Sequence, residues 1–374
     1  MSTEGQQGVS PAAGAPAGVR SIAPYRPGRP IGEVARELGL DPAGIVKLAS
    51  NENPLGMSPK AVAAAQQVLA GGARYPDANG HDLKQALARH YGVDAGWITL
   101  GNGSNDILEL AARALVGPGQ GIIHSRYAFI VYPLVAQAIG AVGIEVPDAD
   151  LGHDLAAMLA AITPETRMVF IANPNNPTGT FIPGDALLRF LEQVPPQVAV
   201  VLDEAYTEYL APEQRYDALA WVKRFPNLIV SRTFSKAYGL AGLRVGFAVA
   251  QPALTDLMGR VRQPFNVNSA ALAAAEAVLD DADYLTRSYQ INREGRAQLV
   301  QAFEALGLEY VPSSGNFVLV KVGDAAGIND RLLRAGIIVR PVANYGLPEW
   351  LRVSVGLPEE NRVFIDALTK ILGQ

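Results

Sequence analysis

Three polar motifs each follow a short apolar run, and together they carry an amine, a carboxylate and an amide. Lys236 follows "LIVSRTFS", Asp203 follows "VAVVL", and Asn176 lies in "NPNNPTG" after "MVFIA". Ligands of open α/β sheets bind beyond the carboxyl ends of the strands, so we expect the three side chains to converge. A lysine that is partly desolvated and near other cations has a lowered pKa, and it can act as a nucleophile and later as a base.

Each motif alone also has a structural explanation. The composition of "NPNNPTG" is that of a turn, Asp203 could cap a helix, and an isolated lysine is usually a solvated surface charge. The segment "GNGS", Gly101 to Ser104, could be a glycine turn that starts a helix. Their common place at the edge of one predicted sheet favours a shared chemical role over four separate structural ones.

The elements that must position these residues alternate along the chain from about residue 55 to 250. Segments with helical spacing, such as "NDILELAARAL", separate short continuous apolar runs. Such runs are typical of strands buried on both faces of a mostly parallel sheet, with helices on either side. From about residue 275 a long charged helical stretch precedes further strands and helices, which indicates a smaller α+β domain.

The sequence therefore predicts an α/β protein with two domains. The large domain spans residues 51–274, and the small domain is formed by residues 19–50 and 275–374. Residues 1–18 are rich in Gly, Pro, Ala, Ser and Gln and are predicted to be a disordered tail. They do not resemble a signal peptide, and no apolar run reaches membrane-spanning length, so the prediction is a cytoplasmic protein without membrane contact.

Composition excludes several classes of site. The chain of 374 residues has no cysteine, which rules out disulfides, thiolate catalysis and Cys-ligated metal centres. With four histidines and no HExxH motif, it is predicted to bind no metal. Its net charge of -5 argues against nucleic acid or an anionic membrane as a partner.

Taken together, the motifs resemble those of pyridoxal-phosphate-dependent aminotransferases of fold type I, and among them the histidinol-phosphate aminotransferases. The resemblance covers nearly the whole chain from about Val19. It includes "KLASNENPLG", "RYPD", "NPNNPTG", "LDEAYTEY", "TFSKAYGLAGLRVGF" and "LRVSVG". It implies a large, mostly parallel sheet domain sandwiched by helices, a smaller α+β domain, and pyridoxal 5'-phosphate as cofactor.

The resemblance assigns roles around the cofactor. Lys236 would bond to its aldehyde, Asp203 would keep the pyridine nitrogen protonated, and Tyr206 and Asn176 would contact the phenolic oxygen. Lys236, Asp203 and Tyr206 are the predicted catalytic residues. The predicted phosphate site combines a helix N-terminus with hydroxyls and a cation, supplied by Gly103, Ser104, Asn105, Thr233, Ser235 and Arg244.

Two aromatic positions complete the implied cofactor site. Tyr127 in "SRYAFIVY" is predicted to stack on the cofactor ring. Phe129 is the alternative, because this segment differs from the more common sequence of the family. Tyr75 in "RYPD" would reach the phosphate of the neighbouring subunit. The resemblance therefore implies a homodimer with composite active sites.

The implied substrates are histidinol phosphate and 2-oxoglutarate, which becomes glutamate. Arg352 in "LRVSVG" would grip a carboxylate or a phosphate, and Arg340 would be a second clamp. Tyr25, Asn51 and Tyr345 are predicted to line the same pocket. The alternative for Arg340 is a charge on a surface loop.

Other functions remain open. An aromatic amino acid aminotransferase and a pyridoxal-phosphate decarboxylase of a phosphorylated amino acid share this pattern. An NAD(P)-dependent dehydrogenase would use "LGNGSND", but Asp106 stands where the third small residue of GxGxxG belongs. A transcription regulator of the same fold would need an added DNA-binding domain, and 18 residues cannot hold one.

Overall fold

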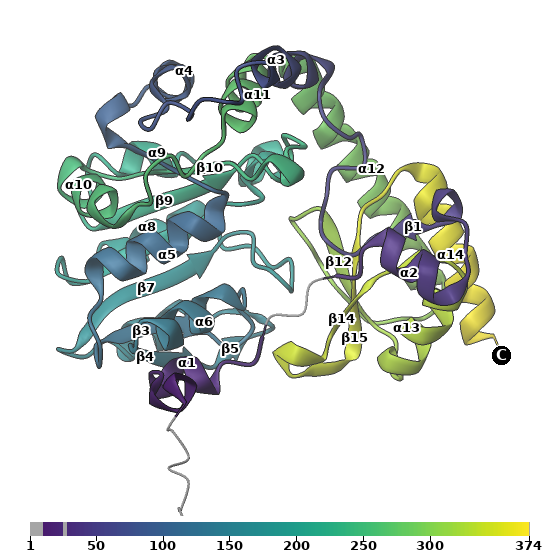
Figure 1. Cartoon of the computed structure of the whole chain (residues 1–374). Helices are drawn as coiled ribbons and strands as arrows, with labels where there is room; N and C mark the ends of the chain where they lie inside the picture. Colours follow the sequence, from purple (N-terminus) through teal and green to yellow (C-terminus); the bar gives the residue numbers. More distant parts are fainter. Residues whose placement is uncertain (1–9, 25–27, 374) are drawn as a thin grey trace, which may run out of the picture.

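A computed structural model describes residues 10–24 and 28–373 and places them in two lobes (Figure 1). The larger lobe is built on a seven-stranded sheet. Its strand order is β2 (Ile98–Gly101), β10 (Gly246–Val249), β9 (Leu228–Thr233), β8 (Ala199–Asp203), β7 (Thr166–Ala172), β3 (Gly121–Ser125) and β4 (Val142–Val146). Strand β10 runs in the opposite direction to the other six strands of this sheet, which are all parallel to one another. The prediction of a mostly parallel sheet is therefore confirmed.

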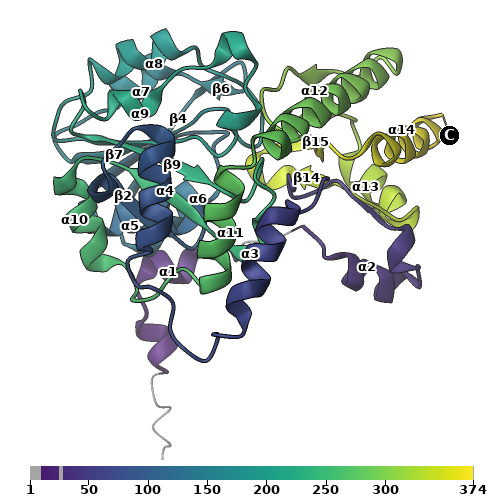
Figure 2. The ribbon, with the colours of Figure 1, turned by 90° about the horizontal axis from the view of Figure 1, so that it is seen from above.

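Helices cover both faces of the large sheet, which explains why the strand sequences are continuously apolar. One face packs against α5 (Ser104–Leu115), α6 (Val131–Ala138) and α10 (Pro252–Val261). The other packs against α3 (Pro59–Leu69), α4 (His81–Tyr91), α7 (Leu155–Ala160), α8 (Gly184–Leu191), α9 (Ala218–Trp221) and α11 (Ser269–Leu279). Helices α3, α4 and α11 pack together, as Figure 2 shows from above.

The smaller lobe is an antiparallel sheet with helices packed on it. Its strand order is β11 (Tyr310–Val311), β12 (Phe317–Lys321), β15 (Leu347–Ser354) and β14 (Arg340–Val342). The long helix α12 (Ala282–Ala305), α13 (Ala325–Arg334) and α14 (Pro358–Leu372) supply Phe303, Leu332 and Phe364 to its core. The predicted boundaries between the domains stay a prediction.

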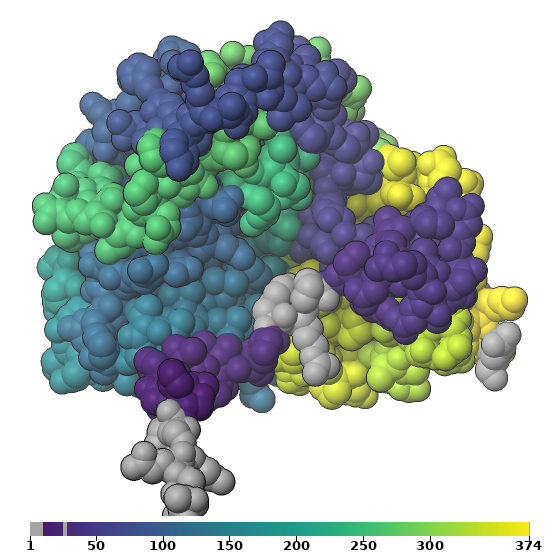
Figure 3. All heavy atoms as spheres, in the orientation of Figure 1, coloured from purple at the N-terminus to yellow at the C-terminus, as the bar shows by residue number. Residues whose placement is uncertain are grey.

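Short elements connect and cover the two lobes. Strand β1 (Val46–Lys47) pairs with β13 (Ile337–Ile338) in parallel, and β5 (Asp148–Ala149) pairs with β6 (Gly152–His153). Helix α2 (Ile31–Leu38) packs on the small lobe, where Figure 3 shows it in purple. Short 3-10 helices lie at Pro42–Gly44, Ala95–Trp97, Thr207–Tyr209, Pro212–Gln214, Ala241–Leu243 and Ala343–Tyr345.

The predicted disordered tail, residues 1–18, is corrected for the part that the structure describes. Pro11–Gly14 forms a 3-10 helix that Ser10 caps, with its Oγ accepting from the N–H of Ala12 at 3.3 Å. Helix α1 (Ala17–Ser21) then lies against α6 of the large lobe. Composition hid both elements because a proline-fixed turn needs no apolar periodicity. Residues 1–9 lie outside the described residues.

Strand register brings the polar motifs to one edge of the large sheet. Asp203, the last residue of β8, pairs with Ala172 of β7 on one side and Ser231 of β9 on the other. Farther along the edge, Gly246 of β10 lies between Thr233 and Gly101. The three motifs that follow β7, β8 and β9, and the start of α5 after β2, therefore meet at the edge that faces the small lobe.

Candidate active site

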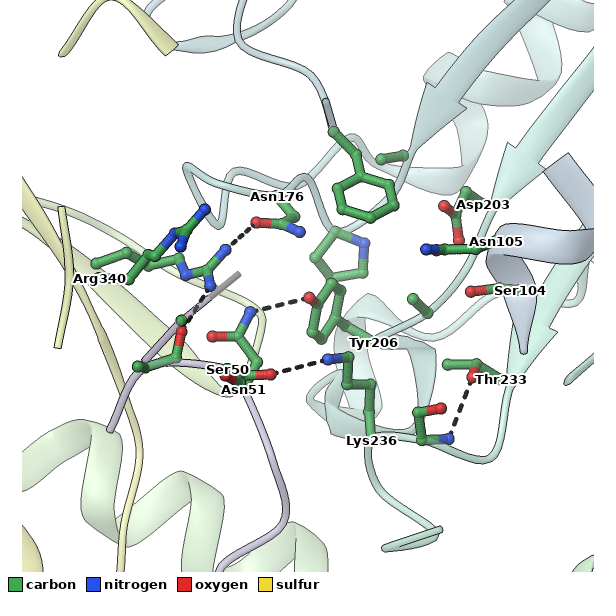
Figure 4. A pocket seen from close by; sticks show the side chains of 18 of the residues that line it. Ser50, Asn51, Ser104, Asn105, Asn176, Asp203, Tyr206, Thr233, Lys236 and Arg340 are labelled. Carbon is green, nitrogen blue, oxygen red and sulfur yellow. Dashed lines mark hydrogen bonds between the residues drawn. The ribbon is translucent and has the colours of Figure 1, made fainter. Parts of the chain in front are cut away.

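A pocket of about 210 Å³ lies where the strand ends of the large lobe meet β14 and β15 of the small lobe (Figure 4). Most of the predicted site residues line it. They are Asn51, Ser104, Asn105, Asn176, Asp203, Tyr206, Thr233, Ser235, Lys236, Arg244, Arg340, Tyr345 and Arg352. Tyr25 lies outside the described residues, and Gly103, Tyr127 and Tyr75 do not line the pocket.

Lys236 projects its amine into the pocket, where Nζ donates to the carbonyl oxygen of Ser50 at 3.1 Å. The same amine lies 5.8 Å from the centre of the Tyr206 ring. Burial and, to a smaller extent, the guanidinium of Arg352 together lower the pKa of Lys236 to about 8. Lys236 is therefore an amine that can lose its proton near neutral pH, as a nucleophile must.

Asp203 is a buried carboxylate with one oxygen satisfied and one not. Tyr132 donates to Oδ2 at 3.0 Å, whereas Oδ1 has no hydrogen-bond partner within residues 10–24 and 28–373. Burial raises the pKa of Asp203 to about 6, and the hydrogen bond from Tyr132 opposes that rise. The unsatisfied oxygen fits a cationic donor, and the protonated nitrogen of a pyridine ring is such a group.

Tyr206 and Asn176 lie on the small-lobe side of the carboxylate. The amide of Asn51 donates to the Tyr206 hydroxyl at 2.9 Å, and burial raises the pKa of Tyr206 to about 12. Oδ1 of Asn176 accepts from Arg352 at 2.5 Å. Tyr206 therefore keeps its proton at neutral pH and can donate it to an oxyanion.

The other two asparagines of "NPNNPTG" hold the loop together. Asn173 donates to the hydroxyl of Tyr216 at 2.9 Å, and Asn175 donates to the carbonyl oxygen of Tyr127 at 2.6 Å. Both are completely buried away from the pocket lining. Among the three, only Asn176 lines the pocket.

The predicted phosphate site is a cradle between the start of α5 and the loop that carries Lys236. The hydroxyl of Thr233 accepts from the N–H of Ser235 at 3.1 Å, and Arg244 donates to Oγ of Ser235 at 3.4 Å. The first N–H groups of α5 have no partner within their helix, so they suit an anion.

Glycines keep this cradle open. A Cβ on Gly103, which has φ of +86°, would lie 2.7 Å from Nη2 of Arg244. A Cβ on Gly246 would lie 2.7 Å from the backbone nitrogen of Ser104. Gly103 thus shapes the cradle without lining the pocket. The cradle fits the phosphate of the predicted cofactor.

The choice of Tyr127 as the stacking aromatic is corrected. Phe129 lines the pocket, whereas the ring of Tyr127 packs in an apolar cluster with Leu319, Val342 and Trp350 of the small lobe. Sequence could not decide between the two because both are aromatic and only two residues apart. The turn after β3 determines which ring faces the pocket.

Tyr75 lies on the surface, with 82% of its area exposed. Its ring stacks on Phe265, with 4.6 Å between the ring centres. The two rings line a separate surface hollow together with Asn102, which directly precedes the cradle residue Gly103. Tyr75 therefore does not contribute to the pocket of its own chain, and its predicted role in a neighbouring subunit stays a prediction.

Three contributors to the site gave no clear sequence signal. Tyr132 looks like an ordinary helix residue, yet it supports Asp203. Behind the pocket, a buried ion pair joins Arg232 to Glu204 with 2.8 Å between Nη2 and Oε2. The pair connects the ends of β8 and β9, one residue from Asp203 and from Thr233. The sequence separation of 28 residues hides it.

Comparison with known proteins gives the class. A family model described as aminotransferase class I and II matches residues 43–368. The chain therefore belongs to that family. No group of His, Asp and Glu in the described chain could hold a metal ion, and no described helix is long and apolar enough to cross a membrane.

Among the proteins that the chain is similar to are several histidinol-phosphate aminotransferases. One from Ralstonia nicotianae is 66% identical over 360 residues, which cover 95% of this chain and 96% of that protein. One from Cupriavidus pinatubonensis is 63% identical over 376 residues and covers 100% of both. The crystal structure from Sinorhizobium meliloti, in complex with pyridoxal-5'-phosphate, has a TM-score of 0.88 at 31% identity. It covers 100% of this chain and 99% of that one.

These likenesses confirm four predictions: the fold class, the resemblance to histidinol-phosphate aminotransferases, the aminotransferase activity and pyridoxal phosphate as cofactor. The roles of individual site residues and the homodimer stay predictions.

The lowered pKa of Lys236 predicts how cofactor attachment depends on pH. An amine attacks an aldehyde only when unprotonated, so attachment to the cofactor-free protein should accelerate through about pH 8 and level off above it. An ordinary lysine, with a pKa of about 10.4, would continue to accelerate well beyond that point. The measurement is the rate at which visible absorbance appears after mixing with pyridoxal phosphate at different pH values.

The Arg352→Gln variant is the matched control for this experiment. It removes a cation that disfavours the ammonium form, so the pKa of Lys236 and the midpoint of the rate should both rise. A wild-type midpoint at or above about pH 10 would contradict the assignment of a lowered pKa to Lys236.

Proposed function

We propose that the protein is a histidinol-phosphate aminotransferase, which moves an amino group between histidinol phosphate and 2-oxoglutarate with glutamate as the other product. The observation that carries the proposal is the pocket itself. It places Lys236, Asp203 and Asn176 at three strand ends, opposite Arg352 and Arg340 of the small lobe. The identity of 66% with a histidinol-phosphate aminotransferase supports the choice within the family.

The cofactor would be held by groups already in place. Ser104, Asn105, Thr233, Ser235 and Arg244 would bind its phosphate, with Gly103 leaving the space. Oδ1 of Asp203 would hold the proton on its ring nitrogen, and Phe129 would lie against the ring. Pyridoxal phosphate supplies an aldehyde that condenses with amines and a ring that withdraws electrons from the reacting carbon.

Lys236 would act twice. Its unprotonated Nζ would hold the cofactor through the aldehyde when no substrate is present. Once free of the cofactor, Nζ would be a base in the pocket that can carry the proton lost by the donor carbon. Tyr206 and Asn176 would donate to the phenolic oxygen of the cofactor and so stabilise the negative charge on that oxygen.

The two arginines would select the substrates. Histidinol phosphate offers a phosphate, whereas glutamate and 2-oxoglutarate offer carboxylates, and a guanidinium fork binds either group. Arg352 donates hydrogen bonds to Oδ1 of Asn176 and, at 3.0 Å, to the carbonyl oxygen of Ala49. Its position is therefore fixed before an anion arrives, which favours binding. Arg340 also lines the pocket, from β14 beside Arg352 on β15.

The substrate proposal predicts a preference for the phosphorylated donor. With 2-oxoglutarate as acceptor, kcat/KM for histidinol phosphate should exceed that for phenylalanine by at least about 100-fold, because two arginines face the anion. Histidinol, which lacks only the phosphate, is the matched substrate control and should react as poorly as phenylalanine. The assay follows glutamate formation. An equal or higher kcat/KM for phenylalanine would make this an aromatic amino acid aminotransferase, and release of CO2 from a phosphorylated amino acid would make it a decarboxylase.

We also propose that the protein acts as a homodimer in which Tyr75 reaches the phosphate cradle of the partner subunit. Two features support this proposal. Tyr75 and Phe265 form a stacked pair of exposed aromatic rings, and such surfaces mark contacts between proteins. The hollow that they line also contains Asn102, and the next residue, Gly103, belongs to the phosphate cradle.

Subunit mixing tests the shared site. Tyr75→Ala should weaken retention of pyridoxal phosphate by at least about tenfold, because a hydrogen bond to a charged phosphate is lost. Mixing this variant with the inactive Lys236→Ala variant should restore activity, since a mixed dimer has one site with both residues intact. Lys236→Ala mixed with wild type is the control and should add none. Failure of the two variants to complement, or a monomer by size-exclusion chromatography, would contradict the proposal.

A further inference from the structure

Ser354, the last residue of β15, lies behind the pocket and is 3% exposed. It does not line the pocket, but its hydroxyl makes two hydrogen bonds with Asn51, which does. The backbone N–H of Asn51 donates to Oγ of Ser354 at 2.8 Å, and this Oγ donates to Oδ1 of Asn51 at 2.9 Å. The amide nitrogen of Asn51 then donates to the hydroxyl oxygen of Tyr206 at 2.9 Å.

Counting protons along this chain fixes the direction of every hydrogen bond. A backbone N–H can only donate, so Oγ of Ser354 accepts from Asn51 and has one proton of its own to give. That proton goes to Oδ1 of Asn51, which turns the NH2 group of the amide toward Tyr206. An NH2 group can only donate, so the Tyr206 oxygen accepts. The proton of Tyr206 is left for the pocket.

The opposite orientation of the Asn51 amide would undo this arrangement. Oδ1 would then face Tyr206 and take its proton, while the NH2 group would face Ser354. The Ser354 oxygen would receive two donors, and its own proton would have no acceptor among the hydrogen bonds that this hydroxyl makes within residues 10–24 and 28–373. An unsatisfied buried donor costs about 1–3 kcal/mol, so the hydroxyl of Ser354 selects one orientation.

The backbone of Asn51 is fixed in place, so the amide orientation that Ser354 selects determines which group faces Tyr206. The backbone of Asn51 has φ of +54°, a left-handed conformation that few residues other than glycine adopt. Asn316 of the small lobe donates to the carbonyl oxygen of Asn51 at 3.0 Å, and Asn51 is 1% exposed. Ser354 and Arg352 are two residues apart on β15, so they lie on the same face of the strand.

We propose that Ser354 is a positioning residue for the reaction, which orients the Asn51 amide so that Tyr206 donates its proton to the phenolic oxygen of the cofactor. The proposal rests on the proposed function, because it takes pyridoxal phosphate as the occupant of the pocket. The charged and titratable groups that face Tyr206 are Arg352, Asp203, Tyr345 and Lys236. None of them belongs to the Ser354–Asn51 pair, so a change at Ser354 leaves these groups in place.

The test is the pH titration of the visible absorption band of the protein with bound cofactor. The phenolic oxygen is most negative when the bond between the cofactor and Lys236 is unprotonated, so a donor to that oxygen lowers the pH midpoint. Ser354→Ala should therefore raise the midpoint by roughly half a unit to one unit. Ser354→Thr keeps the hydroxyl and should restore the wild-type value. Ser314→Ala removes another buried hydroxyl, which accepts a hydrogen bond of 2.9 Å from Gln214 and does not line the pocket. This variant should leave the midpoint unchanged.

A double-mutant cycle separates action through Tyr206 from every other route. Tyr206→Phe should raise the midpoint, and adding Ser354→Ala to it should raise it no further, since the donor is already gone. Should Ser354→Ala not fold, Ser354→Cys replaces it, because a thiol of similar size is a weaker donor and should shift the midpoint in the same direction.

Two results would overturn the positioning role of Ser354. One is a folded, cofactor-loaded Ser354→Ala protein with the wild-type midpoint. The other is a shift that is as large in the Tyr206→Phe background as in the wild type. A wild-type protein that shows no visible band with pyridoxal phosphate refutes the proposed function itself, and the role of Ser354 with it.

Discussion

Burial of an amine beside a carboxylate, between two lobes, is the constraint on which the rest of the site depends. Burial is the main reason why the pKa of Lys236 is lowered to about 8 and the pKa of the Asp203 carboxyl is raised to about 6. Each shift reflects the free-energy cost of a buried charge, and a bonding partner for either group would reduce that cost. A cofactor with an aldehyde and a basic ring nitrogen supplies both partners at once. The unsatisfied Oδ1 of Asp203 marks where the second partner belongs.

One short segment of chain joins the two lobes at this pocket. The carbonyl oxygen of Ala49 accepts from Arg352, and that of Ser50 accepts from Lys236. Asn51 contacts both Tyr206 and Ser354, and Asn53 donates to the carbonyl oxygen of Ala237 beside the lysine at 2.9 Å. Arg352 of the small lobe and Lys236 of the large lobe therefore both hydrogen-bond to the backbone of the same short segment, which fixes their relative positions. This arrangement explains why residues so distant in sequence can keep one geometry.

Much of this architecture could be predicted from the sequence because it depends on local patterns. Continuous apolar runs identified the buried strands, and the rule that ligands bind at strand ends placed Asn176, Asp203 and Lys236 together. Glycines beside a helix start identified the cradle. Residues whose roles depend on long-range packing could not be found in this way. Nothing near Tyr132 indicates that its hydroxyl meets Asp203, and nothing near Ser354 indicates that its partner is 303 residues away. Tyr127 was preferred to Phe129 for the same reason, since the turn after β3 is set by packing against the small lobe.

Reduction of the cofactor-loaded protein with borohydride tests the central claim most directly, because it makes the bond between the cofactor and an amine permanent. Digestion and mass spectrometry then locate the modified residue. The account predicts that the mass of the reduced cofactor is found on the peptide that contains Lys236 and on that residue alone. Modification of a different lysine, or of none in a protein that shows the visible band, would contradict it.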